Sequence, residues 1–181
     1  MNLKLVLKLV GRVLLLEAAA LMVPLMVALL YRESPAPFLL AIAIVAAVGF
    51  GLSALPARQQ FFTREGFVTV GLIWIFTGLV GALPFMFSGW FATPMDAIFE
   101  SCSGFTTTGS TILTDIESLP KGILFWRAFT HWLGGMGVLV LATAIVPKLG
   151  IRSHYLTKAE TPGPVFSKLV PKQSQTSKIL Y

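Results

Sequence analysis

The chain has 181 residues, of which 55% are hydrophobic and only 12% are charged, and its mean hydropathy is +0.80. Soluble domains carry about 25% charged residues, so this composition argues against an ordinary soluble domain and indicates an integral membrane protein. The formal net charge of +6 does not indicate a nucleic-acid partner, because the basic residues are not gathered in a soluble domain and excess Lys and Arg more often fixes orientation in a membrane.

Four stretches of the chain are long and apolar enough to cross a bilayer as helices, which takes about 20 residues. They are Val13–Leu30, Phe38–Ala57, Gly66–Phe87 and Phe125–Val146. The apolar run of the first exceeds that of a typical signal peptide, so we expect it to be retained. Within it, Pro24 predicts a kink. For Glu17, we expect a local ion pair with Arg12 or exposure at the interface.

The distribution of basic residues predicts that both chain termini are cytoplasmic. With the N-terminus inside, the cytoplasmic flanks of the spans hold 11 of the 14 Lys and Arg residues. The opposite side holds the other three basic residues together with five of the eight acidic residues. The reverse orientation would violate the positive-inside rule.

A short helix is predicted in the outer segment Ser88–Leu124, between the third and fourth spans. Thr93 is a candidate N-cap, Pro94 suits the first helical position and Asp96 completes a capping box. Apolar residues then recur at helical spacing and define one apolar face: Met95, Ile98, Phe99, Cys102 and Phe105. Gly104 is expected to end the pattern.

The segment Ser101-Cys-Ser-Gly-Phe-Thr-Thr-Thr-Gly-Ser-Thr111 follows as a polar loop between membrane spans. Irregular backbone at membrane depth survives only where it is buried in protein or lines a water-filled path. Carbonyl and hydroxyl oxygens can replace the hydration shell of an alkali cation, and Gly109 can reach the positive φ that turns a carbonyl towards a pore axis. We predict a cation filter made by Thr106, Thr107, Thr108, Gly109 and Ser110.

These elements predict an all-α integral membrane protein with four transmembrane helices, one re-entrant pore helix and a filter loop. Residues 1–62 form two N-terminal transmembrane helices, residues 63–147 form a helix–pore loop–helix repeat, and residues 148–181 form a basic cytoplasmic linker or tail. That tail contains three prolines and scattered lysines, and we expect no packed core there.

Other polar residues do not indicate catalysis, because nothing places a base beside a serine nucleophile, and we expect no cofactor. One cysteine and two histidines give little basis for a disulfide or a metal cluster. We expect His131 to make a structural hydrogen bond, and Arg127 to reach the outer interface or to anchor the pore loop. Gly134-Gly-Met-Gly137 is interpreted as a site of close helix packing, as are Gly49 and Gly51.

Three motifs together resemble the Trk/Ktr/HKT superfamily of potassium transporters, and most closely its Trk-type membrane subunit. They are Ser103-Gly-Phe-Thr-Thr-Thr-Gly109, His131-Trp-Leu-Gly-Gly-Met-Gly-Val138 and Ala159-Glu-Thr-Pro-Gly-Pro-Val165. The resemblance implies potassium as the transported ion and a multi-pass protein of the bacterial inner membrane. It also implies a cytosolic nucleotide-binding regulatory subunit as a partner and a homodimer of the full-length protein.

In that superfamily four helix–loop–helix repeats surround one potassium path, whereas this sequence contains a single repeat. We therefore expect a fragment or truncated product that contributes the first quarter of a pore and requires the missing repeats. The alternatives are a homotetrameric channel built from single repeats and a small, non-conducting membrane interaction or assembly protein.

Overall fold

The computed structural model describes residues 3–56, 63–135 and 137. These residues form helices and connecting loops and contain no strand. The helices are α1 (Leu3–Ala20), α2 (Met22–Leu30), α3 (Ala36–Ser53), α4 (Thr63–Val80), α5 (Leu83–Ser88), α6 (Pro94–Phe105) and α7 (Lys121–Gly135). The all-helical prediction is confirmed for this part of the chain.

Within the described residues, three helical stretches are long and apolar enough to cross a membrane: Leu3–Leu30, Ala36–Ser53 and Gly66–Ser88. They overlap the first three predicted spans, although the first begins at Leu3 and not at Val13. The fourth predicted span begins within α7, but its second half lies outside the described residues. The predicted linker, residues 148–181, also lies outside them.

Two of these three stretches are interrupted one turn before a proline. A proline ring clashes with the carbonyl four residues earlier and supplies no N–H to it. Pro24 accordingly follows a break at Leu21, just after α1 ends at Ala20. In the same way, Pro84 lies four residues after the end of α4 at Val80. The interruption at Leu21 agrees with the disturbance expected from Pro24, whereas the break in the third span was not predicted.

The second span is shorter than predicted. This span was predicted to extend to Ala57, but α3 ends at Ser53, with Ala54 as the C-cap. Pro56 explains the difference, because its ring disfavours helical geometry in the residue before it, Leu55. The hydrophobicity of the segment alone could not locate the C-terminal end of α3.

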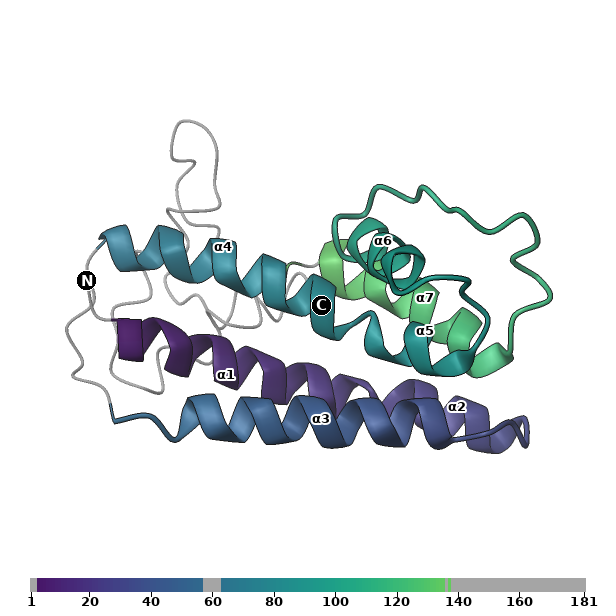
Figure 1. Ribbon diagram of the computed structural model, residues 1–181, viewed down its shortest axis with the longest axis horizontal. Helices are drawn as coiled ribbons and strands as arrows, with labels where there is room; N and C mark the ends of the chain where they lie inside the picture. Colours follow the sequence, from purple (N-terminus) through teal and green to yellow (C-terminus); the bar gives the residue numbers. More distant parts are fainter. Residues whose placement is uncertain (1–2, 57–62, 136, 138–181) are drawn as a thin grey trace, which may run out of the picture.

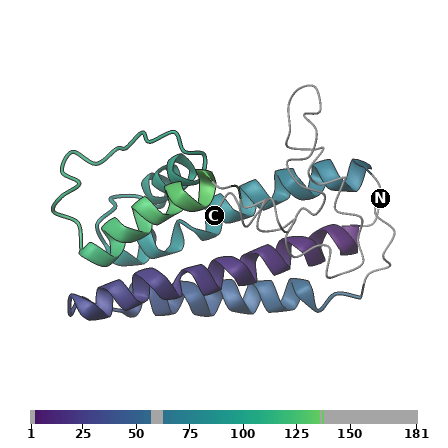
Figure 2. The ribbon, with the colours of Figure 1, turned by 180° about the vertical axis from the view of Figure 1, so that it is seen from behind.

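Figure 1 shows the long helices side by side, with α1 between α3 and α4, and Figure 2 gives the same arrangement from behind. Glycine allows α1 and α3 to approach closely. A Cβ on Gly11 would lie 2.8 Å from the carbonyl oxygen of Gly49, closer than real Cβ atoms come. Gly49 therefore has the packing role predicted for it. Gly51 does not, because a Cβ there would meet nothing within 4 Å.

At one end of the molecule, α6 and α7 pack on each other and on α5 and α2. The connection between α2 and α3 holds the start of α7 there. The carboxylate of Glu33 accepts hydrogen bonds from the backbone N–H of Lys121 at 2.6 Å and of Gly122 at 2.9 Å. A carboxylate at a helix N-terminus satisfies unpaired N–H groups and complements the positive end of the helix dipole.

The apolar face predicted for α6 is not its buried face. Met95 is 70% exposed and Phe99 is 44% exposed, while Glu100 and Ser101 are buried against the other helices. A membrane protein can present apolar side chains outward, because lipid is as apolar as they are. The polar residues of α6 are instead turned inward.

Candidate ion-binding loop after α6

The start of α6 is fixed by the capping box predicted from the sequence. The backbone N–H of Asp96 donates to Thr93 Oγ1 at 3.2 Å, and the N–H of Thr93 donates to Asp96 Oδ2 at 2.9 Å. Pro94 occupies the first helical position, where a missing N–H costs nothing. The helix therefore begins at a defined residue just after a turn.

The end of α6 is defined by a left-handed residue that leads into the loop. The helix passes through Gly104 and ends at Phe105, one residue later than expected. The N–H of Thr107 then donates to the carbonyl of Gly104 at 2.9 Å, and that of Thr108 to the carbonyl of Ser103 at 3.0 Å. This pair of bonds is a Schellman motif, which places its left-handed residue at Thr107.

Thr107 adopts this conformation with φ of 56°, at a position where glycine is usual. A β-branched residue at positive φ is a genuine outlier. Strain of this kind gathers at functional sites, where the surrounding structure maintains it. The loop therefore keeps a threonine at a position where glycine would stabilise the backbone.

Thr107→Gly should raise the free energy of unfolding or leave it unchanged, because the left-handed conformation costs an L-residue roughly 1–2 kcal/mol and glycine offsets part of that gain through its greater freedom when unfolded. Denaturant titration of the chain in detergent micelles measures the effect. Thr106→Gly is the control, since Thr106 has a φ of −81° and the change should destabilise. Destabilisation by Thr107→Gly as large as that of the control would contradict the strain.

Beyond Thr107 the loop presents a run of exposed oxygen-bearing residues. Gly109 has a φ of 77°, as the sequence predicted, and a Cβ there would meet nothing within 4 Å. The hydroxyls of Thr106 and Thr108 are 2.8 Å apart. All five predicted filter residues, Thr106 to Ser110, are exposed within the described chain, so their oxygens are accessible to an ion.

Side-chain hydrogen bonds between α6 and the loop stabilise this conformation. Ser103 Oγ donates to the carbonyl of Ser110 at 2.6 Å and so ties the end of the loop to the helix. One residue later, Thr111 Oγ1 donates to Glu100 Oε2 at 3.0 Å. The C-terminal end of the loop is therefore anchored to α6 by two hydrogen bonds.

Glu100 is itself held by α7. It is 1% exposed, and Nε of Arg127 donates to its Oε1 in a buried ion pair. Of the two expectations for Arg127, the structure agrees with the one in which this residue anchors the loop. His131 Nδ1 lies 2.9 Å from the carbonyl oxygen of Arg127, which agrees with the structural hydrogen bond expected for that histidine.

Sequence reasoning missed Glu100, Ser103 and Thr111 as supports of the loop. A signal for Glu100 existed, because an acidic residue in a predominantly apolar helix requires a partner and Arg127 supplies a basic residue in the next apolar stretch. The hydrogen bonds of Ser103 and Thr111 had no such signal, since both residues fit a polar loop equally well.

The expectation for Glu17 is wrong. Its side chain is buried, and neither carboxylate oxygen has a hydrogen-bond partner among the described residues. At 3.6 residues per turn, Arg12 lies about 140° away from Glu17 around α1. Glu17 therefore faces α4, α6 and α7, while Arg12 is only partly buried on a different side of the helix.

The crossing of α6 and α7 depends on glycine from both helices. A Cβ on Gly134 would lie 2.0 Å from the carbonyl oxygen of Phe105, and one on Gly104 would lie 2.1 Å from Thr130 Oγ1. The close packing predicted for the glycine run after His131 is thus present at Gly134. This contact is made at Phe105, which directly precedes Thr106, the first residue of the loop.

Comparison with known proteins identifies the family. The model of the TrkH family, described as a cation transport protein, matches residues 36–181. The chain belongs to this family. Membership places the chain among transport proteins and not enzymes, and it confirms the resemblance drawn from the three motifs.

Relatives in the family match the chain along its whole length. The Trk system potassium uptake proteins TrkH of Halomonas elongata and of Escherichia coli K12 are each 41% identical to it over 187 residues. The crystal structure of the potassium transporter TrkH from Vibrio parahaemolyticus covers 99% of the chain, with 35% identity and a TM-score of 0.76. This chain spans only 36–39% of the length of these relatives.

Proposed function

We propose that Thr106–Ser110 supplies one side of a potassium-selective path. The observation that carries this proposal is the loop itself, in which two residues, Thr107 and Gly109, have positive φ in a run of exposed carbonyl and hydroxyl oxygens. Such oxygens can substitute for the hydration shell of an alkali cation. The C-terminal, negative end of the α6 dipole lies at the start of this loop and favours a cation there.

One loop offers oxygens from one side of an ion only, whereas full replacement of the hydration shell needs oxygens around it. We propose that further loops complete the filter. The greater length of the relatives supports loops on the same polypeptide. A homotetramer of this repeat would supply four copies of Thr107, Thr108 and Gly109 instead.

The architecture proposed around this loop has four transmembrane helices, with α6 as a re-entrant pore helix. Residues 1–62 form the N-terminal pair of helices, residues 63–147 the pore unit, and residues 148–181 a cytoplasmic linker. The names of the relatives support potassium as the substrate. Their bacterial sources, together with the candidate membrane spans of this chain, support a location in the bacterial inner membrane. The family resemblance further supports a cytosolic nucleotide-binding regulatory subunit and dimerisation of the full-length protein.

The proposed orientation can be tested by cysteine labelling. Ser34 and Ser118 lie in connections near the Glu33-capped start of α7, while Ala54 follows the opposite end of α3. In a Cys102→Ser background, Ser34→Cys and Ser118→Cys should react with an impermeant thiol reagent in intact cells. Ala54→Cys should react only after the membrane is opened. Labelling of Ala54→Cys in intact cells would reverse the orientation.

The transport function can be tested in a chimaera in which this chain replaces the matching segment of the E. coli relative. The chimaera should restore growth of a potassium-uptake-deficient host at low potassium, and the chain alone should not. Selective potassium current from the purified chain, running as a stable tetramer, would instead establish the homotetrameric channel. A chimaera that reaches the membrane without restoring uptake would favour a non-conducting interaction or assembly protein.

Gly109→Ser in that chimaera should weaken the discrimination between potassium and sodium, because a Cβ restricts the backbone turn at a φ of 77°. Gly89→Ser is a matched control. Gly89 also has a positive φ, 73°, and open space around it, but it lies before α6 and outside the loop. Rubidium uptake in the presence of sodium measures the effect. An equal loss of selectivity in both variants would remove Gly109 from the ion path.

A further inference from the structure

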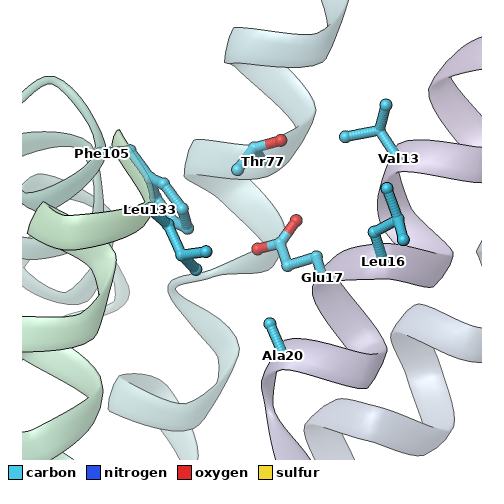
Figure 3. Close-up of a pocket in the computed structure, with 7 residues that line it drawn as sticks. All are labelled: Val13, Leu16, Glu17, Ala20, Thr77, Phe105 and Leu133. Atoms are coloured by element: carbon cyan, nitrogen blue, oxygen red, sulfur yellow. The ribbon is translucent and has the colours of Figure 1, made fainter. Parts of the chain in front are cut away.

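A small cavity lies among α1, α4, α6 and α7, beside the base of the loop. Its volume is about 40 Å³, and the described residues that line it are two polar residues, Glu17 and Thr77, and otherwise apolar ones. The apolar lining residues are Val13, Leu16, Ala20, Phe105 and Leu133. Figure 3 shows the Glu17 carboxyl and the Thr77 hydroxyl directed into the same space between α1 and α4.

Among the described residues, several polar atoms around this cavity lack hydrogen-bond partners. Glu17 is 5% exposed, and both of its carboxyl oxygens are without a hydrogen bond, as are Thr77 Oγ1 and Ser101 Oγ, in fully buried positions. Each buried polar group left unsatisfied costs about 1–3 kcal/mol. A carboxyl and two hydroxyls in one place therefore require a ligand that satisfies them.

The spacing of these groups suits a bridging molecule. A Cβ placed on Gly81 would lie 3.0 Å from Glu17 Oε1 and 2.9 Å from Ser101 Oγ, so these two oxygens are within about 6 Å of each other. Two O–H···O hydrogen bonds through one water span roughly 5–6 Å. Ser101 does not line the cavity, but its hydroxyl borders the same carboxyl.

The lining favours water over a metal ion as this ligand. A buried water makes about three hydrogen bonds and needs at least about 10–15 Å³. The cavity has that volume, and the unpartnered polar atoms of its lining are the two carboxyl oxygens of Glu17 and the hydroxyl of Thr77. A potassium ion would need oxygens on all sides, whereas most of this wall is apolar. A dry cavity is expected only where the lining is wholly apolar, which Glu17 and Thr77 prevent.

We propose that this cavity is a buried hydration site, in which at least one ordered water bridges the carboxyl of Glu17 to the hydroxyl of Thr77, with Ser101 in the same polar cluster. The water joins α1 to α4, and Ser101 of α6 lies within about 6 Å of the same carboxyl. Because Phe105 lines the cavity and directly precedes Thr106, the hydrated cluster supports the base of the loop. This site is independent of the proposed potassium path.

Water-edited solid-state NMR on the chain in lipid bilayers, with ¹³C at Glu17 and at threonine, tests the proposal. Magnetisation from water protons should reach Glu17 Cδ and Thr77 Cβ several-fold faster than Thr130 Cβ. Thr130 is the matched control, because it is equally buried but donates to the carbonyl of Arg127 at 2.7 Å. Transfer to Glu17 and Thr77 as slow as to Thr130 would overturn the hydration site.

Two variants test whether the carboxyl holds the water. In Glu17→Gln, whose amide keeps an acceptor and donors, transfer to Thr77 should persist. In Glu17→Leu it should fall to the rate of Thr130. Fast transfer to Thr77 in Glu17→Leu would contradict the proposed bridge, since the water would then not depend on Glu17. Spectra of the remaining residues establish that each variant is folded.

Discussion

Arg127→Met should lower the free energy of unfolding by about 3–5 kcal/mol, the usual loss when one partner of a buried ion pair is removed. The guanidinium of Arg127 is the partner of Glu100, whose side chain is 1% exposed. Without it, a buried carboxylate remains uncompensated. Because Thr111 donates a hydrogen bond to the same carboxylate, the C-terminal end of the loop should also become more mobile. Equilibrium unfolding in mixed micelles measures the stability, and proteolysis rates report on the loop.

Two further variants separate the ion pair from general effects of charge. Lys121→Met removes a basic residue from the same helix, but at an exposed position, and should change stability by less than about 0.5 kcal/mol. The double variant Glu100→Leu/Arg127→Met should recover most of the lost stability, since apolar replacement of a whole buried pair is often neutral. A double variant as unstable as Arg127→Met would show that the loss did not come from the unpaired carboxylate.

Gly134→Ala should destabilise the chain by about 1–3 kcal/mol or more, the cost of overpacking a tight contact. The added methyl would lie 2.0 Å from the carbonyl oxygen of Phe105 and 2.7 Å from its carbonyl carbon. These are backbone atoms, which a side-chain rotation cannot move away. Helix α6 must shift, and Phe105 carries the start of the loop with it.

Gly135→Ala is the control for this prediction. A Cβ at Gly135 would meet only Thr107 Cγ2, at 3.7 Å, which is an ordinary contact. Alanine is also the better helix former by about 1 kcal/mol, so this variant should be neutral or stabilising. Thermal unfolding of both variants compares them directly. Equal midpoints for the two would contradict the close crossing of α6 and α7.

Local signals in the sequence predicted most of the helices and the form of the loop. The capping residues Thr93 and Asp96 and the glycine at 109 act within a few residues, so their roles could be read from the chain. The prediction that Glu17 pairs with Arg12 or is exposed at the interface was wrong, because the residues around Glu17 come from α4, α6 and α7, which are distant in sequence. The burial of Glu100 was missed for the same reason.

The exposed apolar stripe on α6 illustrates a second limit. Helical periodicity identified one apolar face, with Met95 and Phe99 on it, but periodicity does not state which way a face points. In water the apolar face turns inward, whereas next to lipid or another apolar surface it can turn outward. The orientation of α6 is instead decided by the polar partners of Glu100 and Ser103.

The cap that Glu33 provides on α7 has a mechanical consequence. Its two carboxylate oxygens accept hydrogen bonds from the first two backbone N–H groups of α7. This helix therefore cannot slide along or rotate about its axis without breaking both hydrogen bonds. The same helix also stabilises the loop, because its Arg127 forms the ion pair with Glu100. A displacement of α7 large enough to reshape the loop must therefore either move the connection between α2 and α3 with it or break the two hydrogen bonds of Glu33.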